Sequence, residues 1–223
     1  MPWERDADMR VRAQHLSARR VHDGNWVGAR GTRDGALVTS DWLQALIIEG
    51  RGFCAGIGLL GDGEALQAAA ITTLRPALWI RVPDKTTIIP FYGAIQVEDS
   101  GSTVFEVTIG FASSDVGNGS SDGADFGPRV LRSGSGRPSN CIARQEATGN
   151  VGADPDQDLW RYFTPVDTDA ETDAGPLPQL EWNPRPGPVL VGPATLMMYI
   201  GSTSAPLVTA QFSWVEFETD EVV

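Results

Sequence analysis

Few side chains in this sequence could act as a catalytic base or hold a transition metal. It contains two histidines, His15 and His22, and two cysteines, Cys54 and Cys141. Both histidines fall in an N-terminal stretch with weak periodicity, whereas a catalytic histidine needs a rigid scaffold. The cysteines lie far apart in the chain and fit no zinc-binding spacing. We therefore predict no histidine or zinc centre and two free thiols, with a long-range disulfide as the alternative.

Carboxylates are abundant, since Asp and Glu together number 29. Glycoside cleavage requires two carboxylates held about 5–10 Å apart in a cleft. Glu98 and Glu106 instead fall near predicted strand ends or on outward faces, where solvated positions account for them. The stretch from Asp115 to Asp125 offers oxygen ligands of the kind that Ca²⁺ prefers, but it lacks the EF-hand order and the terminal Glu. A solvated loop is the expectation, and a Ca²⁺ site is the alternative.

One stretch of the sequence matches the glycine spacing of the dinucleotide-binding motif but lacks the strand and helix that the motif requires. Residues 56–61 read Gly-Ile-Gly-Leu-Leu-Gly, and the pattern has meaning only between the strand and the helix of a βαβ unit. A turn, Asp62-Gly63, follows it instead, and no alternation of strands and helices surrounds it. We therefore predict no catalytic residues, no metal and no cofactor, and expect a protein that is not an enzyme.

Tryptophan is the residue type that most favours a binding role, because seven are present. Exposed aromatic rings can stack on sugars, and Trp is also enriched in subunit interfaces. Trp42 and Trp214 have the pattern of core residues. Trp79 lies opposite the inward face of its strand, where a partner or another layer must cover it. The predicted interface residues are Trp3, Arg5, Arg10, Arg12, Arg19, Arg20, Trp26 and Trp79.

Charge is unevenly distributed along the chain, whose net charge is −12. Residues 1–34 carry seven Arg against five acidic residues, which leaves +2 there and −14 on the remainder. The acidic remainder disfavours nucleic acid and membranes as partners. The polar N-terminal residues lead us to expect no signal peptide, and no apolar run in the sequence reaches membrane-spanning length. We interpret residues 1–30 as an arm that docks onto an acidic neighbouring copy, with a frayed terminus as the alternative.

The clearest helix signal lies between Ser40 and Gly50. Ser40 stands where an N-cap is expected, and Gly50 ends the run. Apolar pairs spaced four residues apart form one stripe between them, Trp42 with Leu46 and Leu43 with Ile47. We predict one short helix here, although Ile47 and Ile48 could equally begin a strand.

From Phe53 onward, apolar residues alternate with a period of two, as in half-buried strands. Pro90 and Gly93 interrupt one alternation and indicate an edge strand or a bulge. Strands are predicted at 53–59, 69–72, 77–82, 86–98, 103–111, 129–132, 140–144, 160–164, 194–200 and 206–218. This many short strands separated by turns favours a β-sandwich or jelly roll. We expect an extended N-terminal arm over 1–30 and one sandwich domain over 31–223, with long loops at 113–128 and 145–188.

The block from Ala77 to Glu98, ALWIRVPDKTTIIPFYGAIQVE, resembles a strand–turn–strand pattern of small jelly-roll and sandwich proteins of bacteriophage virions. It combines an apolar strand, a Val-Pro turn, an Ile-Ile-Pro start and a strand that ends in an acid. The acidic body, the Arg-bearing N-terminal segment and the closing aromatic strand are similar to those of head-decoration or capsid-associated proteins. The resemblance covers residues 31–112 and 195–218 and implies no particular functional residue.

The resemblance implies a structural virion protein of a bacteriophage, in a decoration, cement or minor capsid role. We expect a homo-oligomer, with a trimer as the first hypothesis, made in the host cytoplasm and attached to the major capsid protein or another virion protein. Two alternatives stay open. A shallow aromatic patch would favour a carbohydrate or host-surface binding module of a spike or fibre, and a cleft with two carboxylates would favour a glycoside-cleaving tail component.

Overall fold

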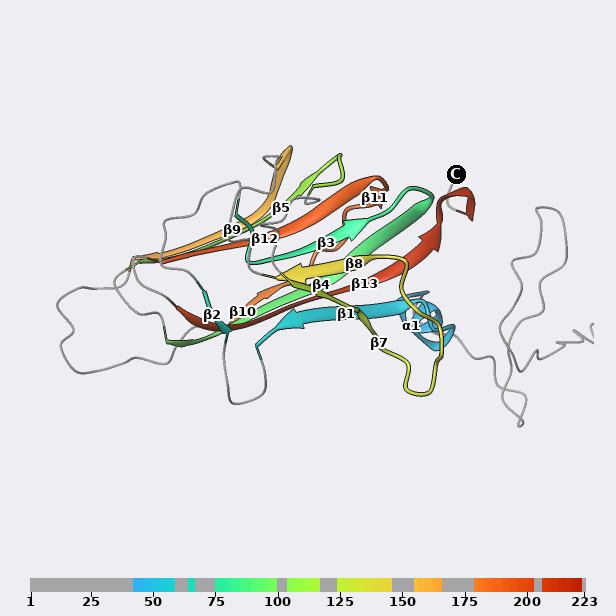
Figure 1. The fold of residues 1–223 in the computed structure, drawn as a ribbon, viewed down its shortest axis with the longest axis horizontal. Coiled ribbons are helices and arrows are strands. Elements are labelled where there is room, and N and C mark those ends of the chain that lie inside the picture. The colour runs from blue at the N-terminus through green and yellow to red at the C-terminus, as the bar shows by residue number, and fades with distance from the viewer. Residues whose placement is uncertain are drawn as a thin grey trace, which may run out of the picture.

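Two antiparallel β-sheets face each other in the computed structural model, and one short helix lies at one end of them (Figure 1). The structure describes residues 42–58, 64–66, 75–99, 104–116, 124–145, 155–165, 179–202 and 206–221. Both sheets contribute apolar side chains to one main core. The predicted mainly β fold of the sandwich type is confirmed. The jelly-roll assignment and the division into an arm and a body stay predictions.

The first sheet contains the two longest strands. Its members are β1 (Gly52–Ile57), β2 (Glu64–Ala65), β4 (Thr86–Asp99), β7 (Arg129–Val130), β10 (Gln179–Trp182), β11 (Leu190–Val191) and β13 (Leu207–Glu218). Their order is β10-β4-β13-β1-β7, with β11 also paired to β4 and β2 to β13. The last long strand, β13, therefore pairs with the early strand β1, which brings segments from both parts of the chain together.

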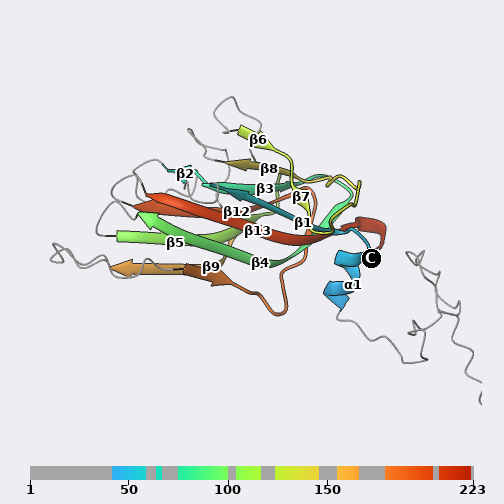
Figure 2. The same cartoon turned by 90° about the horizontal axis from the view of Figure 1, so that it is seen from below.

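The second sheet lies opposite the first. Its members are β3 (Leu78–Val82), β5 (Val104–Ala112), β6 (Ala124–Phe126), β8 (Ile142–Gln145), β9 (Gln157–Pro165) and β12 (Ala194–Ser202). Their order is β6-β8-β3-β12-β5-β9, and Figure 2 shows β6 and β9 at opposite edges. A short 3-10 helix, Thr219–Glu221, follows β13.

The period-two alternation builds the core between the sheets. Leu78 and Ile80 of β3 face inward from one sheet, and Phe212 and Trp214 of β13 face them from the other, all fully buried. Trp182 of β10 meets the Phe212 ring edge-on, with centroids 6.2 Å apart. The predicted core position of Trp214 is confirmed. Burial of these large rings is the main stabilising contribution to the sandwich.

A bulge breaks the alternation in the middle of β4. Tyr92 is opposite Ser213 on β13 and Pro90 is opposite Trp214, so Phe91 has no partner residue on that strand. The extra residue reverses the phase, because Ile88, Pro90 and Ile95 are buried while Phe91 and Tyr92 are half-exposed. Phe91 therefore does not share the core-facing side of β4 with Ile95. The bulge expected at Pro90 and Gly93 is confirmed, but β4 is an interior strand and not an edge strand.

The helix α1 (Trp42–Ile48) ends as the sequence predicted. Gly50 adopts a left-handed conformation with φ 77°. The Gly50 N–H donates to the Ile47 carbonyl at 2.9 Å, and the Arg51 N–H donates to the Leu46 carbonyl at 3.0 Å, which is the double hydrogen bond of a glycine C-cap. None of the seven residues of α1 is buried. The prediction that Trp42 belongs to the core is wrong, since 54% of this residue is exposed.

The loop predicted for residues 145–188 contains more structure than expected. It includes β10, which sequence reasoning missed, and all of β9, which is longer than the predicted strand at 160–164. The predicted strand at 69–72 and the Gly-rich turn before it lie outside the described residues, as does the predicted N-cap Ser40.

Candidate functional site

One predicted interface residue, Trp79, is covered by its own chain. It lies on the outer face of the second sheet in a buried cluster with Ala112, Val116, Met197 and Tyr199, and it is 0% exposed. The segment after β5 is tied over this face, because the Val116 N–H donates to Thr195 Oγ1 at 3.1 Å and this hydroxyl donates to the Ser114 carbonyl at 2.9 Å. The assignment of Trp79 to a subunit interface is therefore wrong.

The other predicted interface residues lie outside the described part of the chain. They are Trp3, Arg5, Arg10, Arg12, Arg19, Arg20 and Trp26. Their docking role stays a prediction, and the same holds for His15 and His22.

An apolar groove lies between α1, the bulge of β4 and the segment that links β10 to β11. Its volume is about 610 Å³. Trp42 and Leu43 form the wall on the helix side, and Val189 lies on the other side with 53% of its surface exposed. The lining residues are Trp42, Leu43, Ile89, Pro90, Phe91, Tyr92, Asn183, Pro184, Arg185, Pro186, Gly187 and Val189. We call this site the α1 groove.

The bulge of β4 supplies the aromatic floor of the α1 groove. Because Phe91 is an extra residue in the strand, two successive aromatic side chains, Phe91 and Tyr92, both line the groove. A regular strand would have sent one of them to the core. The opposite wall fits closely over the strand, since a Cβ at Gly187 would lie 2.5 Å from the Pro90 carbonyl oxygen.

Polar groups border one side of the groove. The Tyr92 hydroxyl donates to Glu181 Oε1 at 3.4 Å, and Asn183 Nδ2 donates to Glu181 Oε2 at 3.4 Å. Partial burial raises the pKa of Tyr92, and the nearby Glu181 carboxylate raises it further. Tyr92 is therefore a neutral hydrogen-bonding group at physiological pH. An apolar floor with a hydrogen-bonding border is suited to binding an apolar side chain.

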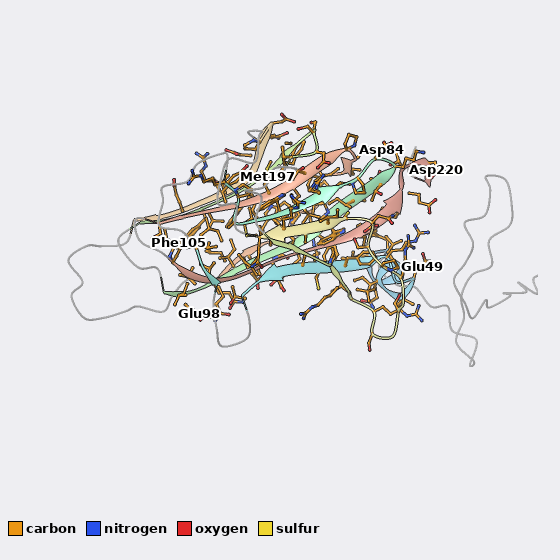
Figure 3. The ribbon with its side chains drawn as sticks, in the orientation of Figure 1. Glu49, Asp84, Glu98, Phe105, Met197 and Asp220 are labelled. Atoms are coloured by element: carbon orange, nitrogen blue, oxygen red, sulfur yellow. The ribbon has the colours of Figure 1, made fainter. Side chains whose placement is uncertain are left out.

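A second and more polar cleft, of about 870 Å³, lies at the end of the sandwich where the last strand, β13, ends. Figure 3 shows Asp84 and Asp220 close to one another there. Lys85, Glu218 and Thr219 also line the cleft. The Thr219 N–H donates to the Lys85 carbonyl at 2.9 Å, which joins the β3–β4 turn to the end of β13. These contacts hold two chain segments together, and we assign the cleft no ligand.

The described residues contain no group of three or more His, Cys, Asp or Glu side chains placed to hold a metal ion. Asp115, the first residue of the predicted Ca²⁺ alternative, instead forms an ion pair with Arg81. Residues 117–123 of that loop lie outside the described part. The prediction of free thiols is confirmed, since neither Cys54 nor Cys141 forms a disulfide.

Comparison of the chain with protein-family models, with curated proteins and with solved structures finds no match. Within the described residues, no helix has the length and apolar character needed to cross a membrane.

Sequence reasoning missed the α1 groove because it placed Trp42 in the core. One signal for it was present. Phe91 and Tyr92 are adjacent in a strand with a period of two, so at least one of the two rings is expected on the outer face of a regular strand. Pro90 before them and Gly93 after them marked an irregularity there, but not which ring it would turn outward.

Proposed function

We propose that this chain is a structural assembly protein that associates with copies of itself and with a larger particle. The observation that carries the proposal is the α1 groove, where the half-exposed Trp42 and Val189 border an aromatic floor. Apolar surface of this kind on a soluble domain marks a site of protein contact. Covering the exposed part of Trp42 would remove on the order of 100 Å² of apolar surface, a gain of about 2 kcal/mol.

The larger particle in this proposal is a bacteriophage virion. The support for it is the resemblance of residues 77–98 to small virion sandwich proteins, together with the acidic body that follows the Arg-bearing N-terminal segment. The function would be mechanical, since added buried contacts strengthen a shell against internal pressure. A neighbouring virion protein, such as the major capsid protein, would be the second partner.

Light scattering on the full-length chain and on a form that lacks residues 1–30 tests the proposal. We expect a homo-oligomer for the full chain, with a trimer as the first hypothesis, and a monomeric mass with an unchanged β-type circular dichroism spectrum for the shortened form. The reason is that removal of the arm removes its tryptophans and Arg residues but none of the described core. A full-length chain that stays monomeric at high concentration would reject the assembly role.

A carbohydrate-binding role is the second candidate, and the border of the groove favours it. Exposed Trp42 and half-exposed Tyr92 offer ring faces, and Glu181 and Asn183 offer hydrogen bonds to hydroxyl groups. Titration of oligosaccharides against tryptophan fluorescence tests it. If the chain is a sugar-binding module, Trp42→Ala abolishes the fluorescence change, whereas Ile142→Ala at an exposed site on β8 leaves it unaltered. Absence of any change for neutral and acidic sugars would reject this candidate.

A further inference from the structure

We infer that the α1 groove receives the segment around Trp26 of a second copy of this chain. The inference rests on the proposed assembly role and names the site and the residue through which it acts. The groove is apolar, it is bordered by exposed Trp42 and Val189, and it lies beside the first described helix. The first 41 residues of the chain lead directly into that helix.

The chemistry of the N-terminal segment selects Trp26 as the residue that enters the groove. Trp26 is followed by Val27, Gly28 and Ala29, so this stretch carries no charged side chain of its own into the groove, whose lining includes one cation, Arg185. Trp3, the other tryptophan of the segment, is followed by Glu4, Arg5 and Asp6. Insertion of Trp3 to the same depth would desolvate three charges, which disfavours it.

The length and the charge of the N-terminal segment both allow it to dock onto a second copy of the chain. Residues 26–42 span up to roughly 50 Å when extended, which exceeds the diameter of a small domain. Residues 1–34 carry +2 and the rest of the chain −14. Two bodies therefore repel each other, whereas the segment of one copy is attracted to the body of another.

Two valines provide a matched pair of variants for the test. Val189 lines the α1 groove and is 53% exposed, while Val191, two positions later, is 48% exposed and does not line it. We expect Val189→Asp and Trp26→Ala each to weaken self-association of the full-length chain at least about tenfold in sedimentation velocity. Val191→Asp should change it less than about twofold, because that residue is not covered on docking.

Mixing the variants distinguishes docking between copies from docking of a segment into its own groove. Val189→Asp keeps an intact segment, and Trp26→Ala keeps an intact groove. An equimolar mixture should therefore form a complex that neither variant forms alone at the same concentration. Failure of the mixture to associate, when wild-type chain does, would overturn the inference that the groove binds a second copy.

The remaining outcomes separate the inference from the proposed function. If Val189→Asp self-associates like wild type while Trp26→Ala does not, the segment docks elsewhere, so the inference falls and the assembly role stands. If the wild-type chain is monomeric, the assembly role itself falls. Trp42→Ser serves as a second groove variant in case Val189→Asp unfolds, because Trp42 belongs to a helix with no buried residue. Circular dichroism confirms the folding of each variant.

Discussion

Glu216 is fully buried, with 1% exposure, unlike the other acidic side chains whose burial the structure describes. It lies on β13, and its carboxylate accepts hydrogen bonds from the Ser139 hydroxyl and from the Asn140 N–H, both at 2.7 Å. A buried carboxylate is costly unless its oxygens are paired. Here the pairing holds residues 139–140, which lie just before β8, against β13 of the opposite sheet, so a single side chain links the two layers.

Substitution of Glu216 should therefore destabilise the fold without changing a residue that lines the α1 groove. We expect Glu216→Ala to lower the free energy of unfolding by about 1–3 kcal/mol, because the Ser139 hydroxyl and the Asn140 N–H, in part-buried hydrogen bonds, both lose their charged acceptor. Urea denaturation measures the loss. Glu218→Ala, at an exposed position two residues later, is the matched control and should change stability by no more than about 0.5 kcal/mol. Equal losses for the two variants would show that the linking contact contributes nothing.

The buried thiol of Cys141 gives the molecule a pH dependence. Burial raises the pKa of Cys141 well above its ordinary value of 9.0, and the Glu216 carboxylate raises it further. The unfolded thiol ionises near pH 9 while the folded one stays protonated. The contribution of the Cys141 thiol to the free energy of unfolding is thus fully present below pH 9, and it is lost as the pH rises toward the pKa of the folded state.

We therefore expect the unfolding free energy of the wild type to fall more steeply above pH 9 than that of Cys141→Ala, by up to about 1.4 kcal/mol per pH unit. Urea denaturation between pH 7 and pH 10.5 measures both slopes. The same slope in both proteins would mean that the thiol is not protected from ionisation.

At this scale the sequence predicted residue burial well only where one face of a strand meets the main core. Trp214 was predicted correctly because its neighbours alternate in phase. Trp79 was assigned to an interface and Trp42 to the core, and both were wrong. Trp79 is buried because the segment Ser114–Val116, more than thirty residues later in the chain, covers it. Trp42 is exposed because it lies on a short helix that has no buried residue. Neither fact is encoded in local periodicity.

At the scale of elements, the long alternating strands could be predicted and the short paired ones could not. β4, β5, β12 and β13 each have nine or more residues, enough for a clear period. β11 has two residues, and its pairing with Ile88 and Thr87 of β4 is decided by the sheet and not by its own pattern. The bulge could be predicted from Pro90 and Gly93, but its effect on the side-chain phase could not, because the position of the extra residue depends on the register with β13.

The segment between β10 and β11 is the element that shapes the α1 groove, and Gly187 is where it approaches β4. A Cβ at this position would lie 2.5 Å from the Pro90 carbonyl oxygen. Gly187→Ala should displace the segment and cost about 1–3 kcal/mol of stability. Gly136→Ala, where a Cβ meets nothing within 4 Å, is the control. Thermal unfolding measures both, and a Gly187→Ala protein as stable as the control would mean that the segment does not rest tightly on the strand.

At the scale of the whole molecule, one part of the sandwich is covered by its own chain and another part is left exposed. Its core and the cover over Trp79 are complete within one chain. Its end beside α1 leaves Trp42, Val189 and Ile48 exposed. A folded body with an apolar groove at one end, preceded by a segment of opposite charge, is an arrangement suited to linking copies in series or in a ring. The charge difference between residues 1–34 and the rest of the chain can be read from the sequence, whereas the groove that we propose the segment enters could not be predicted from it.

This arrangement predicts that thermal stability depends on protein concentration. If the native state is an oligomer joined by the Trp26 segment, a tenfold increase in concentration stabilises it by about 1.4 kcal/mol per bound segment. For a chain of 223 residues, that corresponds to a rise in Tm of about 3–6 °C. Trp26→Ala should unfold at a Tm that does not change with concentration, because its body folds without a partner. Scanning calorimetry from low to high micromolar concentration measures both proteins, and a wild-type Tm independent of concentration would contradict assembly through this segment.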